Sequence, residues 1–190
     1  MPDAPRPRND LPPGRRLVTD PAGVERRGRE MAAESVRFRA WLKFRSGLPD
    51  AEIDALVRET TDQVWAHIDC LECGACCRAL SIVLDDRDIA RLAKRLGISV
   101  GAFARQYVRR AGGEASFAAQ PCPFLDGNAC TVYEDRPRAC RDFPYLHDAG
   151  FRERMLGLIE YALLCPVILN TLEALKRRLP WRKKRHPAQP

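Results

Sequence analysis

Apolar residues recur close to helical spacing along most of this chain, which predicts a mainly α-helical fold. The first such stretch covers residues 26–46, and a second helix opens after Pro49 and leads directly into Cys70. Two further helices are expected between Asp85 and Val108, and two more after residue 150. The pattern therefore predicts a small α-rich single domain.

Extended structure is expected only in short pieces. Residues 81–84 are a strand candidate, and the Asp126-Gly127 turn signal precedes a second candidate at residues 130–133. The stretch from 114 to 150 otherwise reads as irregular, apart from a short helix that opens at Pro137 and presents Cys140. The expected fold is thus mainly α, with a loop-built centre and at most one short β-hairpin.

Composition divides the chain into four predicted segments. Residues 1–25 contain six prolines and little apolar material, so we expect disorder there. Residues 26–64 form a helical extension, residues 65–179 a cysteine-cluster metal-binding domain, and residues 180–190 a basic tail. No signal-peptide pattern and no long charge-free apolar run occurs, which predicts a cytoplasmic protein without a transmembrane segment.

The formal charge of +7 lies at the C-terminal end of the chain. Seven basic residues follow Glu173 without any acidic residue, and the rest of the chain has equal numbers of acidic and basic residues. The seven are Lys176, Arg177, Arg178, Arg182, Lys183, Lys184 and Arg185. This tail could attract an anionic partner, either a nucleic acid or a membrane surface.

Eight cysteines provide the candidate chemistry, and four of them occur within eight residues. We predict that all eight are metal ligands: Cys70, Cys73, Cys76, Cys77, Cys122, Cys130, Cys140 and Cys165. Thiolates are soft ligands suited to zinc or to iron–sulfur clusters, and eight are enough for two four-thiolate centres. Cys165 lies on an apolar helix, where a ligand and a small core residue are equally good interpretations.

The spacing of the cysteines favours an iron–sulfur cluster over zinc. The C-x2-C-x2-C run from Cys70 to Cys76 is half of the bacterial ferredoxin pattern, which takes its other ligand from a remote Cys-Pro dipeptide. The candidate cofactor is therefore zinc or iron, with a [4Fe-4S] cluster as one form of the iron. The histidines His67, His147 and His186 are interpreted as ordinary surface residues.

Adjacent cysteines are hard to direct at one ion, because neighbouring side chains point apart on a helix or a strand. Cys76 and Cys77 therefore suggest two neighbouring centres. The working partition places Cys70, Cys73, Cys76 and Cys165 around one centre. The remaining four, Cys77, Cys122, Cys130 and Cys140, form the other.

Three motifs carry a resemblance to a known family: Cys70-x2-Cys73-Gly-x-Cys76-Cys77, then residues 121–125 (PCPFL), then residues 130–144. Together they resemble the CxxCxxCC, or YkgJ-type, cysteine-cluster family over roughly residues 66–166. The resemblance implies a zinc- or iron-chelating domain built on eight cysteines. A similar arrangement in flagellin lysine N-methylase implies an iron–sulfur centre linked to S-adenosylmethionine chemistry.

Three classes of function follow from these observations. The first is a metal- or cluster-binding protein whose centre is structural or carries electrons, with Arg136 and Arg141 neutralising the thiolates. The second is a metal-dependent protein-modifying enzyme, although no glycine-rich cofactor loop and no catalytic residue can be named. The third is a nucleic-acid-binding zinc module, which a charge-neutral core without an aromatic, basic surface disfavours. The first class is preferred.

Overall fold

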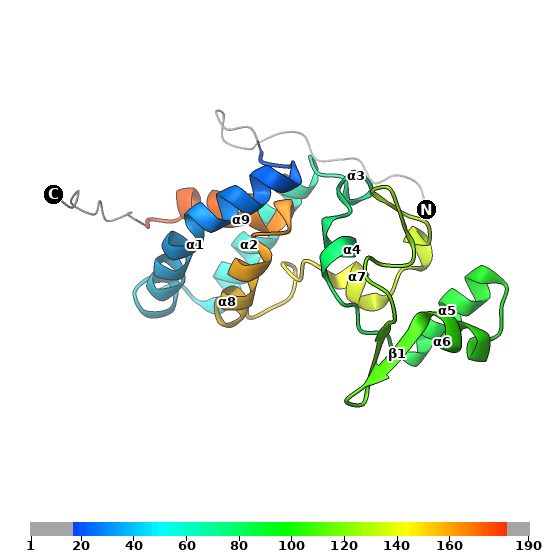
Figure 1. Ribbon diagram of the computed structural model, residues 1–190. Coiled ribbons are helices and arrows are strands. Elements are labelled where there is room, and N and C mark those ends of the chain that lie inside the picture. The colour runs from blue at the N-terminus through cyan, green and yellow to red at the C-terminus, as the bar shows by residue number, and fades with distance from the viewer. Residues whose placement is uncertain (1–16, 182–190) are drawn as a thin grey trace. The chain divides into compact units, whose positions relative to one another are not determined.

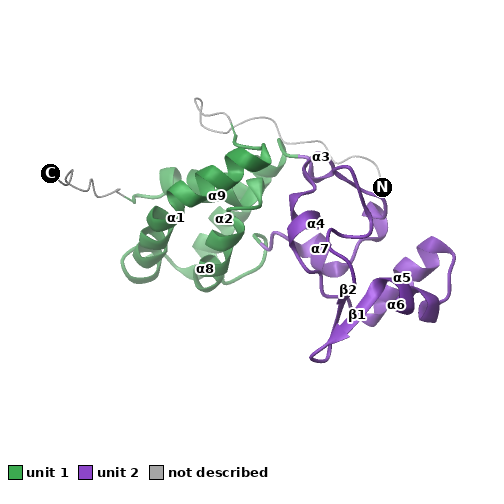
Figure 2. Cartoon of the chain, in the orientation of Figure 1, with its two compact units in different colours: residues 1–68, 146–190 green, residues 69–145 purple. Residues whose placement is uncertain are grey.

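A computed structural model describes residues 17–181, and its mainly α-helical content confirms the predicted fold class (Figure 1). The chain divides into two compact units (Figure 2). Unit 1 combines the N-terminal segment up to Ile68 with the C-terminal segment from Leu146, and unit 2 comprises Asp69–Tyr145. The structure thus groups the C-terminal helices with the N-terminal ones, whereas the sequence-based division placed them in the cysteine domain.

Four helices pack together in unit 1, where α1 and α2 each contact both α8 and α9. Their bounds are α1 Pro21–Phe44, α2 Asp50–Trp65, α8 Phe151–Tyr161 and α9 Pro166–Arg178. The core consists of large apolar side chains such as Phe38, Phe151 and Ile168. Gly28 allows α1 to approach the chain after α8 closely, since a Cβ there would stand 2.9 Å from the Ala162 carbonyl oxygen.

Helix α1 begins at Pro21, earlier than the predicted start at residue 26. The Asp20 carboxylate caps it by accepting a hydrogen bond from the Gly23 amide at 2.7 Å, and proline suits the first helical turn. The Val18 amide and carbonyl both bond the Asn170 side chain, at 3.1 and 2.8 Å. The predicted disorder is therefore wrong for residues 17–25, and residues 1–16 lie outside the described part of the chain.

The C-terminal charge cluster is only partly a tail. Lys176, Arg177 and Arg178 belong to α9, and the Arg178 guanidinium donates to Thr60 Oγ1 and Glu59 Oε1, both at 2.7 Å. The basic residues 182–185 lie outside the described residues. Among residues 17–181, no helix combines the length and the apolar content needed to cross a bilayer.

Unit 2 consists of short elements joined by loops. The helices are α3 Cys70–Cys73, α4 Ala75–Ala79, α5 Asp86–Leu96, α6 Val100–Tyr107, α7 Arg138–Asp142 and the 3-10 helix η1 Tyr133–Asp135. The strands are β1 Val108–Ala111, β2 Glu114–Phe117, β3 Leu125–Asp126 and β4 Ala129–Cys130. They form two separate antiparallel pairs, β1 with β2 and β3 with β4.

The strands differ from the sequence-based expectation. Residues 81–84 form only a single bridge, from Val83 to Ser116, and the candidate strand at 130–133 gives way to η1 after Cys130. A hairpin was missed at Gly112-Gly113, where Ala111 pairs with Glu114. Both glycines have positive φ, 60° and 85°, as a two-residue hairpin turn requires.

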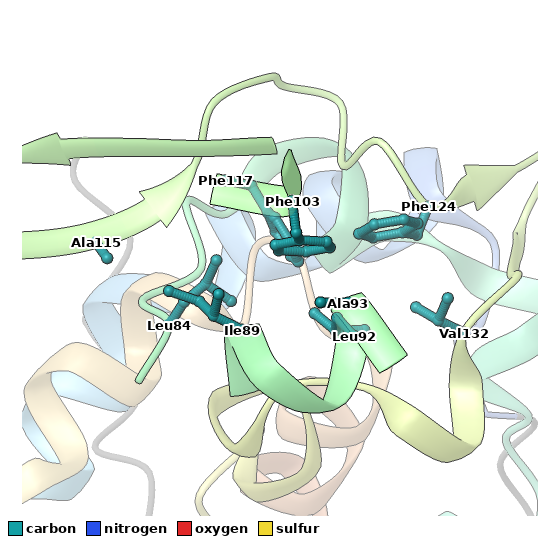
Figure 3. Close-up of a cluster of buried hydrophobic side chains, with 9 residues drawn as sticks. All are labelled: Leu84, Ile89, Leu92, Ala93, Phe103, Ala115, Phe117, Phe124 and Val132. Atoms are coloured by element: carbon teal, nitrogen blue, oxygen red, sulfur yellow. The ribbon is translucent and has the colours of Figure 1, made fainter. Parts of the chain in front are cut away.

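Nine buried apolar side chains form the hydrophobic core of unit 2 (Figure 3). The rings of Phe103, Phe117 and Phe124 lie at its centre, with the Phe103 and Phe124 centroids 6.2 Å apart and nearly parallel. Cys122 and Cys130 pack against this cluster. The core therefore fixes two of the predicted metal ligands.

Candidate metal centre

Seven of the eight predicted ligands lie in unit 2, and Cys165 lies in unit 1. Cys165 is buried where α9 begins, and its amide donates to the Tyr161 carbonyl oxygen at 2.8 Å. Cys70 is exposed, and the remaining six are partly buried. All eight are free thiols.

The Cys70–Cys77 segment folds as two short helices with a sharp turn between them. Asp69 caps α3 by accepting the Leu71 amide at 2.8 Å, and Gly74 ends it in the left-handed region at φ 60°. The turn also brings the backbone against the β3–β4 hairpin, since a Cβ on Gly74 would lie 2.9 Å from the Asn128 carbonyl oxygen. Glycine is therefore required here by backbone conformation and by space.

Arg78 fastens this segment to the hairpin that carries Cys130. Its guanidinium donates to the Cys73 carbonyl oxygen at 3.2 Å and also to the Gly127 carbonyl oxygen and Asn128 Oδ1. A backbone bond adds a second connection, because the Cys122 amide donates to the Cys77 carbonyl oxygen at 2.8 Å. Segments distant in sequence are thereby held side by side, each carrying cysteines.

Burial and backbone amides shift the pKa values of Cys122 and Cys130 in opposite directions. Burial raises the pKa of Cys122 to about 11, while a hydrogen bond from the Phe124 backbone favours its thiolate. Burial also raises the pKa of Cys130, and the Val132 backbone likewise favours the thiolate. Each sulfur thus has a backbone donor two residues ahead, an arrangement that stabilises a charged sulfur in an apolar setting.

Cys77 interacts with five other cysteines of unit 2. Its Sγ is 3.9 Å from Cys76 Sγ, and that contact lowers the pKa of Cys77 to about 7. A charge on Cys77 in turn raises the pKa of the other thiols around it, which are Cys70, Cys122, Cys130 and Cys140. Burial raises the pKa of Cys140 to about 12, and charges on Cys77, Cys122 and Cys130 act in the same direction.

Arg136 places a positive charge among these sulfurs. Its guanidinium lies 3.8 Å from the centroid of the Tyr133 ring and donates to the Tyr133 carbonyl oxygen at 2.7 Å. From this position its charge lowers the pKa of Cys70, Cys130 and Cys140 against the effect of burial. The structure thus gives Arg136 the neutralising position predicted for it, whereas Arg141 donates to the Arg136 carbonyl oxygen.

The segment that carries Arg136 and leads to Cys140 is held by two residues of α5. Asp88 is 2% exposed, pairs with Arg91 and accepts the Arg138 amide at 3.0 Å. Arg91 donates to the carbonyl oxygens of Asp135 and Arg136, at 3.1 and 2.9 Å. This network was not predicted from the sequence, where its only local signal is the Asp85-x-x-Asp88 capping box at the start of α5.

The described histidines do not join the cysteines of unit 2 by any hydrogen bond. His147 bonds the Asp62 carboxylate at 2.8 Å within unit 1, and His67 is exposed. His186 lies outside the described residues.

The donor set fits a soft metal, although the thiols do not yet surround a common point. Within residues 17–181, no three His, Cys, Asp or Glu side chains converge on a position that could hold one ion. Thiolates, backbone donors directed at sulfur and a neighbouring arginine are nevertheless the components that a thiolate-ligated zinc or iron centre uses.

Comparison with known proteins gave one match. Residues 69–160 match the CxxCxxCC family model, whose description reads "Putative zinc- or iron-chelating domain". The match spans all of unit 2, including its seven cysteines, and extends into α8. No curated protein and no solved structure matched the chain. Residues 69–160, which carry the cysteine motifs described above, are thus similar to the CxxCxxCC family of zinc- or iron-chelating domains.

Proposed function

We propose that unit 2 holds its metal through Cys77, Cys122, Cys130 and Cys140. The observation that carries this proposal is a set of hydrogen bonds that hold the segments of these cysteines together: the Cys122 amide donates to the Cys77 carbonyl oxygen at 2.8 Å, and Arg78, next to Cys77, bonds the hairpin that carries Cys130. The bonds of Asp88 and Arg91 position the segment that leads to Cys140. The charges of these thiols also raise one another's pKa. Like charges brought this close oppose one another, and a bound cation removes that cost. These four are also the second group of the sequence-based partition.

The other three cysteines of unit 2 are the proposed ligands of a second centre. Cys70 and Cys73 stand at the two ends of α3, and Cys76 follows the Gly74 turn. Cys165, the fourth member of this group in the sequence-based partition, belongs to unit 1 and is buried there. Cys76 contacts Cys77, so it is the residue through which the two groups adjoin.

We further propose that at least one centre is an iron–sulfur cluster that serves a structural or electron-carrying role. The support is the C-x2-C-x2-C spacing together with a backbone that donates to sulfur, an environment in which such clusters are tuned. When bound, a cluster supplies one-electron chemistry, and zinc supplies structural cross-linking alone. Thiolate ligands need a reducing compartment, which favours the cytoplasm.

Anaerobic purification with metal analysis, acid-labile sulfide analysis and a visible spectrum tests the assignment. We expect a brown protein that contains sulfide and loses its visible absorption on reduction. Colourless protein that contains zinc and no sulfide, even after reconstitution with iron and sulfide, would contradict the proposed iron–sulfur cluster. The proposed cysteine ligands would be unaffected by that result.

The ligand assignment has a separate test in matched variants of the β4 strand. Cys130→Ser should lower the metal content of the purified protein, whereas Ala129→Ser, at the neighbouring exposed position, should leave it unchanged. Full metal occupancy in Cys130→Ser and Cys140→Ser, with both variants folded by circular dichroism, contradicts the four-thiol group.

A further inference from the structure

Unit 1 has an aromatic hollow of about 500 Å³, lined by the end of α1 and by the chain that follows α9. Helix α1 contributes Trp41 and Phe44 to its lining, and the chain after α9 contributes Pro180 and Trp181. Phe44 is 74% exposed, the largest exposed fraction among the large apolar side chains that the structure describes. A solvent-exposed aromatic side chain beside a recess indicates a binding surface rather than a part of the core.

The buried ring of Phe38 contacts both tryptophans that line this hollow. Phe38 is completely buried and stacks on Trp41, with ring centroids 5.9 Å apart and an interplanar angle of 13°. The same ring meets Trp181 edge-on at 5.3 Å. The two indoles therefore need little ordering when a ligand enters, which lowers the entropic cost of binding.

The charge around the hollow has a single sign. Arg37 and Arg45 line it, both are exposed, and neither guanidinium has a hydrogen bond or ion pair among the described residues. No acidic side chain contributes to the lining. In the sequence, Trp181 is followed directly by four basic residues, Arg182–Arg185. A ligand for this surface must therefore combine a flat apolar part with negative charge.

We propose that this hollow binds single-stranded nucleic acid. An unpaired base enters it against Trp41 and Phe44, and the neighbouring phosphates lie on Arg37 and Arg45. Proteins that bind single strands combine aromatic stacking with basic side chains in this way, independently of sequence. A recess that receives one flat ring suits a base, whereas aromatic residues that anchor a protein to a bilayer project into its interface.

The sequence alone concealed this surface, because its two halves are separated by the whole of unit 2. The sequence pattern indicates an ordinary amphipathic helix that ends with Arg37, Trp41, Phe44 and Arg45. It assigns Trp181 to a basic tail. Packing of α9 against α1 brings them together. The neutral core that disfavoured nucleic-acid binding is a property of the chain average and not of this surface.

Fluorescence anisotropy of the full-length, metal-containing protein tests the proposal with a fluorescein-labelled oligouridine of about 12 nucleotides, within the usual single-strand site size. Phe44→Ala should weaken binding about tenfold, the typical effect of losing one stacked base. The double change Arg37→Gln with Arg45→Gln should flatten the slope of log affinity against log salt by about 1.4, as expected for two lost phosphate contacts. Val36→Ala and Arg26→Gln, at exposed positions of α1 outside the hollow, should match the wild type.

Four results would overturn the proposal: no binding of oligouridine, an equal affinity in Phe44→Ala, an equal affinity for a duplex of the same length, or an equal affinity for uridine monophosphate. Binding to phosphatidylserine vesicles that depends on Phe44, without binding to oligouridine, would also overturn it in favour of a membrane. Metal content should be the same in every variant, which separates this test from that of the metal centre.

Discussion

Arg136 acts on the thiols through charge and not through ligation. It is anchored to the Tyr133 ring and carbonyl oxygen, and from there it favours the thiolate forms of three cysteines by lowering their pKa. Four thiolates around a divalent ion leave a net negative charge, so a fixed cation nearby stabilises the loaded centre. A lysine at this position would lack the planar group that stacks on tyrosine.

Arg136→Gln should lower metal affinity about 10- to 100-fold, the usual range for a residue that supports metal ligands. The measurement is a competition titration against a chromophoric chelator. Arg138→Gln is the matched control, since Arg138 is exposed and its side chain pairs only with Asp142 in the described structure, at 3.1 Å. Equal affinities in the two variants would refute a role for the Arg136 charge.

Alanine substitutions at Gly74 and Gly127 distinguish backbone strain at positive φ from a steric clash of the added Cβ. Both have positive φ, 60° and 57°, but only Gly74 faces backbone atoms within 3 Å. Gly127→Ala should cost about 1–2 kcal/mol through backbone strain alone. Gly74→Ala should cost more and should also lower metal content, because the clash pushes the cysteine loop off the hairpin. Urea unfolding compares the two, and equal losses would mean that the close approach is unimportant.

At the scale of elements, α5 serves as a support for the loop that leads to Cys140. Its first turn holds Asp88 with three partners, namely the Asp85 amide, Arg91 and the Arg138 amide. The same helix buries Ile89 and Leu92 in the core of unit 2 (Figure 3). The loop therefore takes its position from the same core that packs against Cys122 and Cys130.

Asp88→Ala should lower the free energy of unfolding by roughly 3 kcal/mol, as expected when one partner of a buried ion pair is removed. The variant should also bind metal more weakly, since the segment before Cys140 loses its anchor. Asp86→Ala is the control, because Asp86 is exposed in the same helical turn and makes only a 3.6 Å contact with Arg110. Denaturant titration and metal analysis of both proteins provide the comparison. Full metal affinity in Asp88→Ala would show that α5 does not position the site.

At the scale of the whole molecule, the two units differ in what stabilises them. Unit 1 buries extensive apolar surface between four helices, whereas unit 2 has short elements and one modest core. Ligation contributes directly to folding where a core is small. The two units should therefore respond differently to the loss of metal.

Removing the metal with a strong chelator should loosen unit 2 and leave unit 1 folded. Hydrogen exchange measured by mass spectrometry should rise across residues 69–145, while the helices α1, α2, α8 and α9 keep their protection. Loss of protection in both units would show that they unfold together. Unchanged exchange in unit 2 would show that its fold does not depend on metal.

The sequence predicted what depends on local pattern and missed what depends on distant pairs. Helical periodicity located α1 and α2, and the cysteine motifs were sufficient to identify the family model that residues 69–160 match. The anchoring of Cys140 by Asp88 and Arg91 could not be predicted, because the bonds join residues more than forty positions apart. The aromatic hollow was missed for the same reason. The β1–β2 hairpin was predictable in principle from Gly112-Gly113.

The division of the chain also orders events on the ribosome. Unit 2 is complete once residue 145 has been synthesised, whereas the helical bundle of unit 1 lacks α8 and α9 until residue 178 has followed. Domains generally fold as they emerge during translation. The cysteine unit can thus acquire its ion while α1 and α2 still wait for their packing partners. A shortage of metal during synthesis would leave an open loop region between two helices whose apolar faces are still uncovered.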